Sequence, residues 1–183
     1  MPKKLINSGV DLNAKDCNGS TALIESIVLN QLEVSEKLVL AGANPNLADN
    51  KNTSPLIFAS WYCREQIVPL LLAHGGEVNG VDEDGYSPLM HSAQNCPDGG
   101  LTALLLRAGA KVNLIAADGN SALTTAAFYG NENAVHVLAA AGANLAAKTK
   151  EGGTALTIAR DRAAGRKESH DRIYIFLRAL QGL

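Results

Sequence analysis

The stretch Asp82-Glu83-Asp84-Gly85-Tyr86-Ser87-Pro88-Leu89 determines the fold, because its closing triplet recurs along the chain. The other copies of the triplet are Thr21-Ala22-Leu23, Ser54-Pro55-Leu56, Ser121-Ala122-Leu123 and Thr154-Ala155-Leu156. Successive leucines of this series are separated by 33, 33, 34 and 33 residues. A second series, Gly9, Gly42, Gly75, Gly109 and Gly142, shows the same separations in the same order. The chain is therefore built from tandem repeats, with the extra residue near 96–100.

Each repeat has the local signals of two helices. Ser or Thr caps a helix by accepting a backbone N–H, and Pro at the next position has the backbone angle that a first helical residue needs. The short helix after the cap carries apolar residues on one face, such as Leu56 and Ala59. A second apolar helix follows, and Gly42 or its equivalents close it in a left-handed conformation. One such pair cannot bury its own apolar face, so the repeats must stack.

The pattern D-x-x-G-x-[ST]-P-L, followed downstream by G-A-x-x-N as in Gly42-Ala43-Asn44-Pro45-Asn46, resembles the ankyrin repeat. The resemblance covers residues 16 to about 180 and implies an all-α repeat solenoid, an L-shaped stack with β-hairpin-like finger loops. We expect one domain over 1–183, with repeats at 16–48, 49–81, 82–115, 116–148 and 149–183. The last repeat has an insertion around Gly165 to Asp171. Residues 1–15 contain only part of a repeat. Either the first helix of that repeat has been cut away, or the stack begins with an irregular cap.

The family's usual His after the triplet is absent here, and Ile24, Ile57, Met90, Thr124 and Thr157 stand in its place. The helix-start hydrogen bonding that this His would supply is therefore not expected in its usual form.

Composition excludes several classes of function. The chain has 183 residues, of which 46% are hydrophobic, so it is not a disordered protein. Its net charge of −2 offers no attraction for a phosphate backbone, and we expect no nucleic-acid partner. The C-terminal basic residues are interrupted by acidic ones, which favours a solvated helix face. The sequence contains no apolar stretch of the length of a signal peptide or membrane span, so we expect no membrane association.

The cysteines Cys17, Cys63 and Cys96 form no CxxC pair, and their odd number argues against a disulfide framework. We therefore expect a reducing, cytoplasmic environment, unless a signal has been trimmed from the chain. Cys63 and Cys96 occupy equivalent places in neighbouring repeats. Because stacked helices lie roughly 8–10 Å apart and a disulfide needs Cα atoms within about 7 Å, the sequence predicts no bond between them.

Catalytic and metal-binding motifs are not found. The four histidines are scattered, and we expect His74 at a helix C-terminus and His91 and His136 on surface or groove positions. The recurring Asp16, Asp49 and Asp82 are interpreted as loop-forming residues, and the prominent Ser and Thr residues as helix caps. We expect no enzyme activity, no metal and no cofactor.

The ankyrin resemblance implies which positions are free to bind a partner: residues beside the finger-loop glycine and two at the end of each first helix. Five of the eight aromatic residues of the chain fall at such positions, and large aromatics dominate binding hot spots. These side chains either face the partner or lean inward between repeats. The predicted partner-binding residues are Trp61, Tyr62, Tyr86, Phe128, Tyr129, Asn50, Lys51, Glu83, Asp84 and Asp118.

The sequence thus predicts a monomeric protein–protein interaction module, a scaffold or adaptor that binds through its concave face and finger loops. One alternative is an inhibitor or immunity-type protein that blocks a single enzyme. Another is the non-catalytic repeat portion of a larger effector or enzyme. The repeat architecture alone does not choose among them, because one fold serves many functions.

Overall fold

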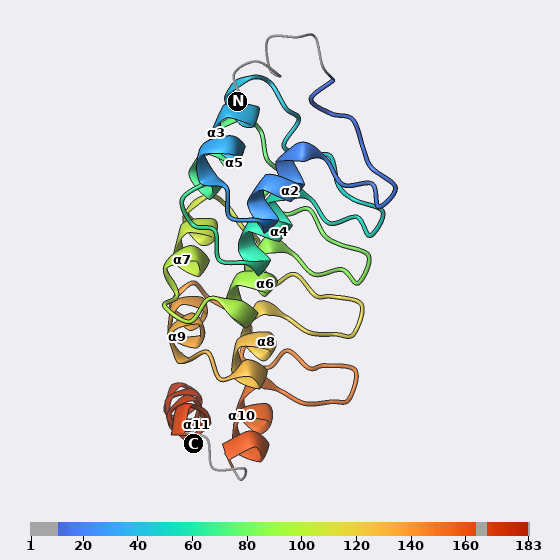
Figure 1. Cartoon of the computed structure of the whole chain (residues 1–183). Helices are drawn as coiled ribbons and strands as arrows, with labels where there is room; N and C mark the ends of the chain where they lie inside the picture. The colour runs from blue at the N-terminus through green and yellow to red at the C-terminus, as the bar shows by residue number, and fades with distance from the viewer. Residues whose placement is uncertain (1–10, 164–167, 183) are drawn as a thin grey trace.

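The computed structural model describes residues 11–163 and 168–182, in which the helices form two columns (Figure 1). The first column contains α2 (Ala22–Val28), α4 (Pro55–Trp61), α6 (Pro88–Asn95), α8 (Ala122–Tyr129) and α10 (Ala155–Ala163). The second contains α3 (Leu32–Leu40), α5 (Val68–Ala73), α7 (Gly100–Arg107), α9 (Glu132–Ala140) and α11 (Glu168–Leu180). Long loops between successive pairs project from the first column, away from the second. The all-helical repeat solenoid predicted from the sequence is confirmed.

The first helices begin at the predicted caps. Ser54, for example, accepts a hydrogen bond from the backbone N–H of Ile57, and Pro55 is the first helical residue. In the fourth repeat, the Thr124 hydroxyl also accepts from the Ser121 backbone N–H at 2.8 Å, which completes a capping box. Threonine thereby provides a helix-start hydrogen bond at the position where the family usually has His.

The loops are ordered by the recurring aspartates. The Asp49 carboxylate accepts hydrogen bonds from the backbone N–H groups of Lys51 and Thr53, at 2.9 and 2.8 Å. Asp16 and Asp82 make the same pair of bonds in their own loops, so the interpretation of these residues as loop-forming is confirmed. Among the described residues the one β-bridge pairs Lys15 with Thr21, so the loops are hairpin turns without regular strands.

The core runs continuously between the columns. Leu56, Leu89 and Leu123 are each at most 1% exposed, as predicted from the repeated triplet. The first helices of adjacent repeats contact each other along the whole stack. Alanines such as Ala59 and Ala126 are fully buried between these helices, and their small size allows the close packing.

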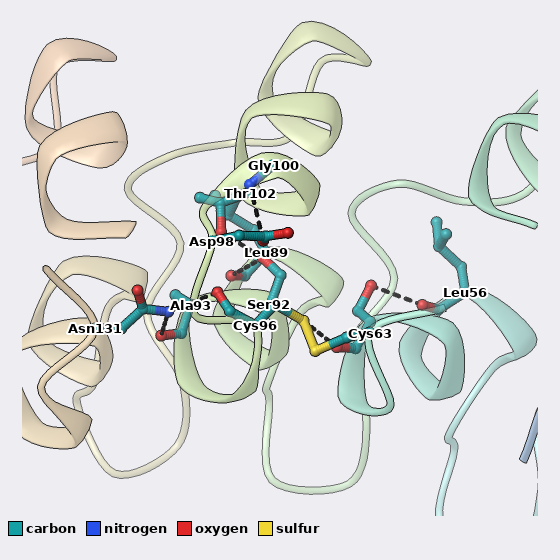
Figure 2. The surroundings of a disulfide bond; sticks show 11 residues. Leu56, Cys63, Leu89, Ser92, Ala93, Cys96, Asp98, Gly100, Thr102 and Asn131 are labelled. Carbon is teal, nitrogen blue, oxygen red and sulfur yellow. Dashed lines mark hydrogen bonds between the residues drawn. A yellow bond between two sulfur atoms is a disulfide. The ribbon is translucent and has the colours of Figure 1, made fainter. Parts of the chain in front are cut away.

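The prediction for the cysteines was wrong, because Cys63 and Cys96 form a disulfide with their Cα atoms 5.5 Å apart (Figure 2). The spacing of roughly 8–10 Å applies to residues that lie within two parallel helices. Both instead stand just past a helix end, with different backbones: Cys63 has a left-handed φ of 54°, and Cys96 is extended. The extra residue of the third repeat follows, and Gly99 restores the left-handed turn with a φ of 73°. The chain can therefore bring the two Cα atoms closer than the helix axes. Cys17 is a free, exposed thiol.

Part of the predicted organisation lies outside the described residues: Leu5, Ile6 and Gly9 of the partial repeat, and Gly165 in the insertion. Within residues 11–163 and 168–182, no helix combines the length and apolar character needed to cross a membrane.

Candidate functional site

An aromatic cluster joins the second and third repeats on the side of the first helices that meets the loops. Trp61 and Tyr62, at the end of α4, are stacked with ring centroids 6.3 Å apart. The Trp61 ring also lies parallel to the ring of His91 on α6, at 5.0 Å. His91 in turn contacts Tyr86 of the third loop, at 5.6 Å. The cluster therefore extends from α4, across α6, to the loop.

His91 is buried, whereas the sequence predicted a surface or groove position for it. Its side chain is 7% exposed, and its Nε2 lies 2.8 Å from the carboxylate of Asp82. Burial lowers the pKa of His91, although the hydrogen bond to Asp82 acts in the opposite direction. A neutral ring that donates from Nε2 leaves Nδ1 without a proton, and Nδ1 is buried with no partner. The Asp82 carboxylate is thus hydrogen-bonded to a neighbouring side chain within the protein.

Tyr86 connects this cluster to the fourth repeat. Its hydroxyl donates to the Asp118 carboxylate at 2.6 Å, and the Asn120 side-chain amide donates to the same oxygen at 2.6 Å. Burial and the hydrogen bond to Asp118 raise the pKa of Tyr86, and nearby Tyr129 adds to the effect. Burial alone would raise the pKa of Asp118, but the hydrogen bonds from Tyr86 and Asn120 outweigh it and lower that pKa. Asp118 is therefore held as a carboxylate.

The second aromatic pair stands at the end of α8. The rings of Phe128 and Tyr129 meet edge to face at 5.1 Å. The Arg162 guanidinium of the last repeat lies 3.4 Å above the Phe128 ring, in a cation–π contact. Phe128 and Tyr129 occupy the same places in their repeat as Trp61 and Tyr62, so the two pairs lie on the same side of the stack.

These aromatics are neither fully buried nor fully free. Trp61 is 44% exposed, Tyr62 42%, Phe128 41% and Tyr129 52%. Each ring thus packs one part against the stack and offers the rest to solvent. We refer to these four residues together with Tyr86 as the recognition surface, the candidate site for a partner.

The charged and polar residues predicted for binding separate into two groups. Asp84, Asp118 and Tyr86 line one cavity of about 520 Å³ between the loops, together with Ala117 and Lys150. At the loop tips farther toward the N-terminus, Lys51 pairs with Glu83 at 3.5 Å. There the Asn50 side chain donates to the Cys17 carbonyl, at 3.2 Å. Ser20 and Thr53 follow the residue at the finger-loop glycine position, a place that the ankyrin resemblance marks as free, but they are only 8% and 4% exposed and cannot contact a partner.

His91 and Arg64 belong to this site but are not among the residues that the sequence predicts for binding. Arg64 places its guanidinium 5.6 Å from the Tyr62 ring centroid and supports that ring. His91 follows Phe58 by 33 positions, so the repeat spacing carried a signal that His91 occupies the place on α6 that Phe58 has on α4. Among the described residues, no group of three or more His, Cys, Asp or Glu side chains could hold a metal ion.

Comparison with known families agrees with the architecture. A family model of three ankyrin repeats matches residues 30–114, and a single ankyrin-repeat model matches residues 118–150. Together these matches cover more than half of the chain. This chain belongs to the ankyrin-repeat family. No curated protein matches the chain as a relative.

Ankyrin repeats are generally protein–protein interaction modules, and proteins built from them are typically non-catalytic. Their helices and loop aspartates are used for folding, and the remaining positions are available for recognition. In this ankyrin-repeat protein those remaining positions hold the two aromatic pairs.

Proposed function

We propose that this ankyrin-repeat protein is a scaffold or adaptor that binds a partner protein through the recognition surface and the adjoining loops. The observation that carries the proposal is the partial exposure of two aromatic pairs at equivalent places, Trp61-Tyr62 and Phe128-Tyr129. Rings held by neighbouring side chains lose little conformational entropy on binding and still desolvate a large area.

The loops add polar specificity beside the aromatic rings. Asp84 is exposed at the cavity where Asp118 stays ionised, and Lys150 lies at the same cavity. Asn50, Lys51 and Glu83 extend the polar border toward the N-terminal loops. Such charges mainly select the partner and accelerate its association. The proposed binding mode uses the chain as a monomer without metal, cofactor or nucleic acid.

The proposal is tested by capture from the native source with matched variants. The full chain, immobilised, is compared with the double variant Trp61→Ala/Tyr129→Ala, and captured proteins are quantified by mass spectrometry. Because truncating two hot-spot aromatics costs about 2 kcal/mol or more, the double variant should lose the partners that the parent retains.

Leu40→Ala is the matched control, because Leu40 is 68% exposed on α3, in the other column of helices. It should capture the same proteins as the parent. Equal loss in both variants, or retention in both, would show that binding lies elsewhere. Several retained partners indicate a scaffold, whereas one stoichiometric enzyme partner indicates an inhibitor.

The expected cytoplasmic location depended on unpaired cysteines, and the Cys63–Cys96 disulfide removes that support. Disulfides persist in oxidising compartments and are rare in the cytosol, where thiol systems keep cysteines reduced. Whether Cys63 and Cys96 are oxidised in the cell therefore decides between a cytoplasmic location and an oxidising compartment.

A further inference from the structure

Side chains tether neighbouring repeats at one recurrent place, the C-terminal end of the first helix. Arg64 of the second repeat donates from Nε to the Ile27 carbonyl of the first repeat, at 3.3 Å. Asn131 of the fourth repeat donates to the carbonyls of Ala93 and Cys96 in the third, at 3.0 and 2.8 Å (Figure 2). Carbonyls at a helix end have no partner within the helix, so these donors complete them while joining two repeats.

The junction between the fourth and fifth repeats has a comparable tether, because His170 Nε2 lies 3.2 Å from the Phe128 carbonyl. The junction between the second and third repeats differs. Counting by repeats, the residue equivalent to Arg64 and Asn131 is Pro97. Proline has no backbone N–H, and its side chain has no donor. This junction therefore lacks the hydrogen-bonded tether.

The disulfide stands where that tether is missing. Ser60 is equivalent to Ile27 and Ala93, and the Cys96 sulfur lies 3.3 Å from its carbonyl oxygen. A sulfur in a disulfide carries no proton, so it cannot donate to this carbonyl. The second helices α5 and α7 also contact each other less than the other adjacent pairs in their column. A covalent bond thus joins the second and third repeats at the helix end where the hydrogen-bonded tether is absent.

We propose that the Cys63–Cys96 disulfide is a redox-controlled clamp between the second and third repeats. In its oxidised form it holds the two halves of the stack in register. A dithiol reductant opens it by thiol–disulfide exchange, which transfers two electrons and two protons to the protein and leaves the reductant as a disulfide.

The two cysteines differ in solvent exposure, and this difference determines which sulfur the reductant attacks. Cys96 is 1% exposed, whereas Cys63 is partly exposed. A reductant thiolate attacks the Cys63 sulfur, the S–S bond breaks, and Cys96 leaves as a thiolate that takes a proton. The second thiol of the reductant then releases Cys63. Once reduced, the Cys96 thiol can donate to the Ser60 carbonyl, but S–H is a weak donor.

Opening the clamp affects the recognition surface directly. Cys63 follows Trp61-Tyr62 in the chain, and the stack of Trp61 on His91 crosses the same junction. Reduction therefore loosens the first aromatic pair relative to the second, and partner binding weakens. This consequence rests on the proposed function, whereas the local opening does not, so the test uses the free chain.

Trp61 is the single tryptophan of the chain, which makes it a local reporter. The full chain is measured before and after treatment with dithiothreitol, by thiol titration, acrylamide quenching of Trp61 fluorescence and amide hydrogen exchange. We expect one free thiol before reduction and three after it. Exchange in residues 60–67 and 92–99 should accelerate by about tenfold or more, while residues 122–138 stay protected. The acrylamide quenching constant should rise at the same time.

Two variants separate the effect of reducing the Cys63–Cys96 bond from any effect of reductant on the free Cys17 thiol. Cys17→Ser removes the exposed thiol and should respond to reductant as the parent does. Cys63→Ser/Cys96→Ser should resemble the reduced parent and be insensitive to reductant. Three free thiols before treatment would overturn the proposal. It would also be overturned if reduction left hydrogen exchange and Trp61 quenching unchanged, because packing alone would then hold the junction.

Discussion

The indole ring of Trp61 lies parallel to the imidazole ring of His91, with 5.0 Å between their centroids, and so covers a buried polar ring from the neighbouring repeat. Trp61 thus contributes to packing as well as to the exposed surface. Tyr129, at the equivalent end of α8, is 52% exposed and meets Phe128 of its own repeat. The two aromatics should therefore differ in their contributions to stability.

Trp61→Ala should lower the free energy of unfolding by about 1–2 kcal/mol, because it removes an inter-repeat stack and uncovers His91. Tyr129→Ala should lower it by under about 1 kcal/mol. Urea denaturation followed by circular dichroism measures both values. Equal losses would mean that the Trp61–His91 contact adds nothing to the stability of the stack.

The buried leucines of the repeated triplet should be the most sensitive positions. Leu56→Ala, Leu89→Ala or Leu123→Ala should each cost about 2–5 kcal/mol, because each leaves a cavity between adjacent first helices. Leu40→Ala is the control, since that side chain is 68% exposed. Thermal or urea melts in which a core variant and the control behave alike would contradict the burial.

His91 should make the protein less stable on mild acidification. Its pKa is lowered by burial in the folded chain, whereas the unfolded chain has the ordinary value of about 6.5. Between these two values the unfolded chain binds more protons, so the free energy of unfolding falls as the pH falls below about 6.5. This contribution is fully present above that pH.

His91→Gln removes this titration while keeping an N–H that can donate to Asp82. The variant should therefore lose less stability than the parent between about pH 7 and about pH 5, measured by urea denaturation at each pH. Parallel losses in the two proteins would assign the pH dependence to other groups.

Two glycines with similar φ values offer a matched test of close packing. Gly130 and Gly142 have φ values of 77° and 82°, so alanine at either one should cost about 1–2 kcal/mol of backbone strain. A Cβ at Gly142 meets nothing within 4 Å, but one at Gly130 would lie 2.8 Å from the His170 ring. Because His170 is 1% exposed and cannot move aside, Gly130→Ala should be the more destabilising variant in thermal melts. Equal losses would mean that the last repeat is not seated on this turn.

The sequence by itself determined the repeat, the helix caps, the loop aspartates and the buried leucines. These features follow from local rules: a Ser or Thr before a helix caps it, and a Leu at a fixed place in every repeat must face its neighbours. The same period located the two aromatic pairs. It did not give their orientation, because the partial exposure of Trp61 depends on contact with a residue thirty positions away in the next repeat.

The tertiary structure alone decided the burial of His91 and the pairing of Cys63 with Cys96. Both depend on backbone detail that a repeat count treats as uniform. Cys63 and Cys96 hold equivalent positions in their repeats but differ in backbone conformation, because the extra residue near Pro97 changes the turn. That local change brings two Cα atoms within 5.5 Å, whereas the spacing of helix axes predicts a longer distance. Periodicity sets which residues neighbour each other in the stack, and the geometry of each turn sets whether they touch.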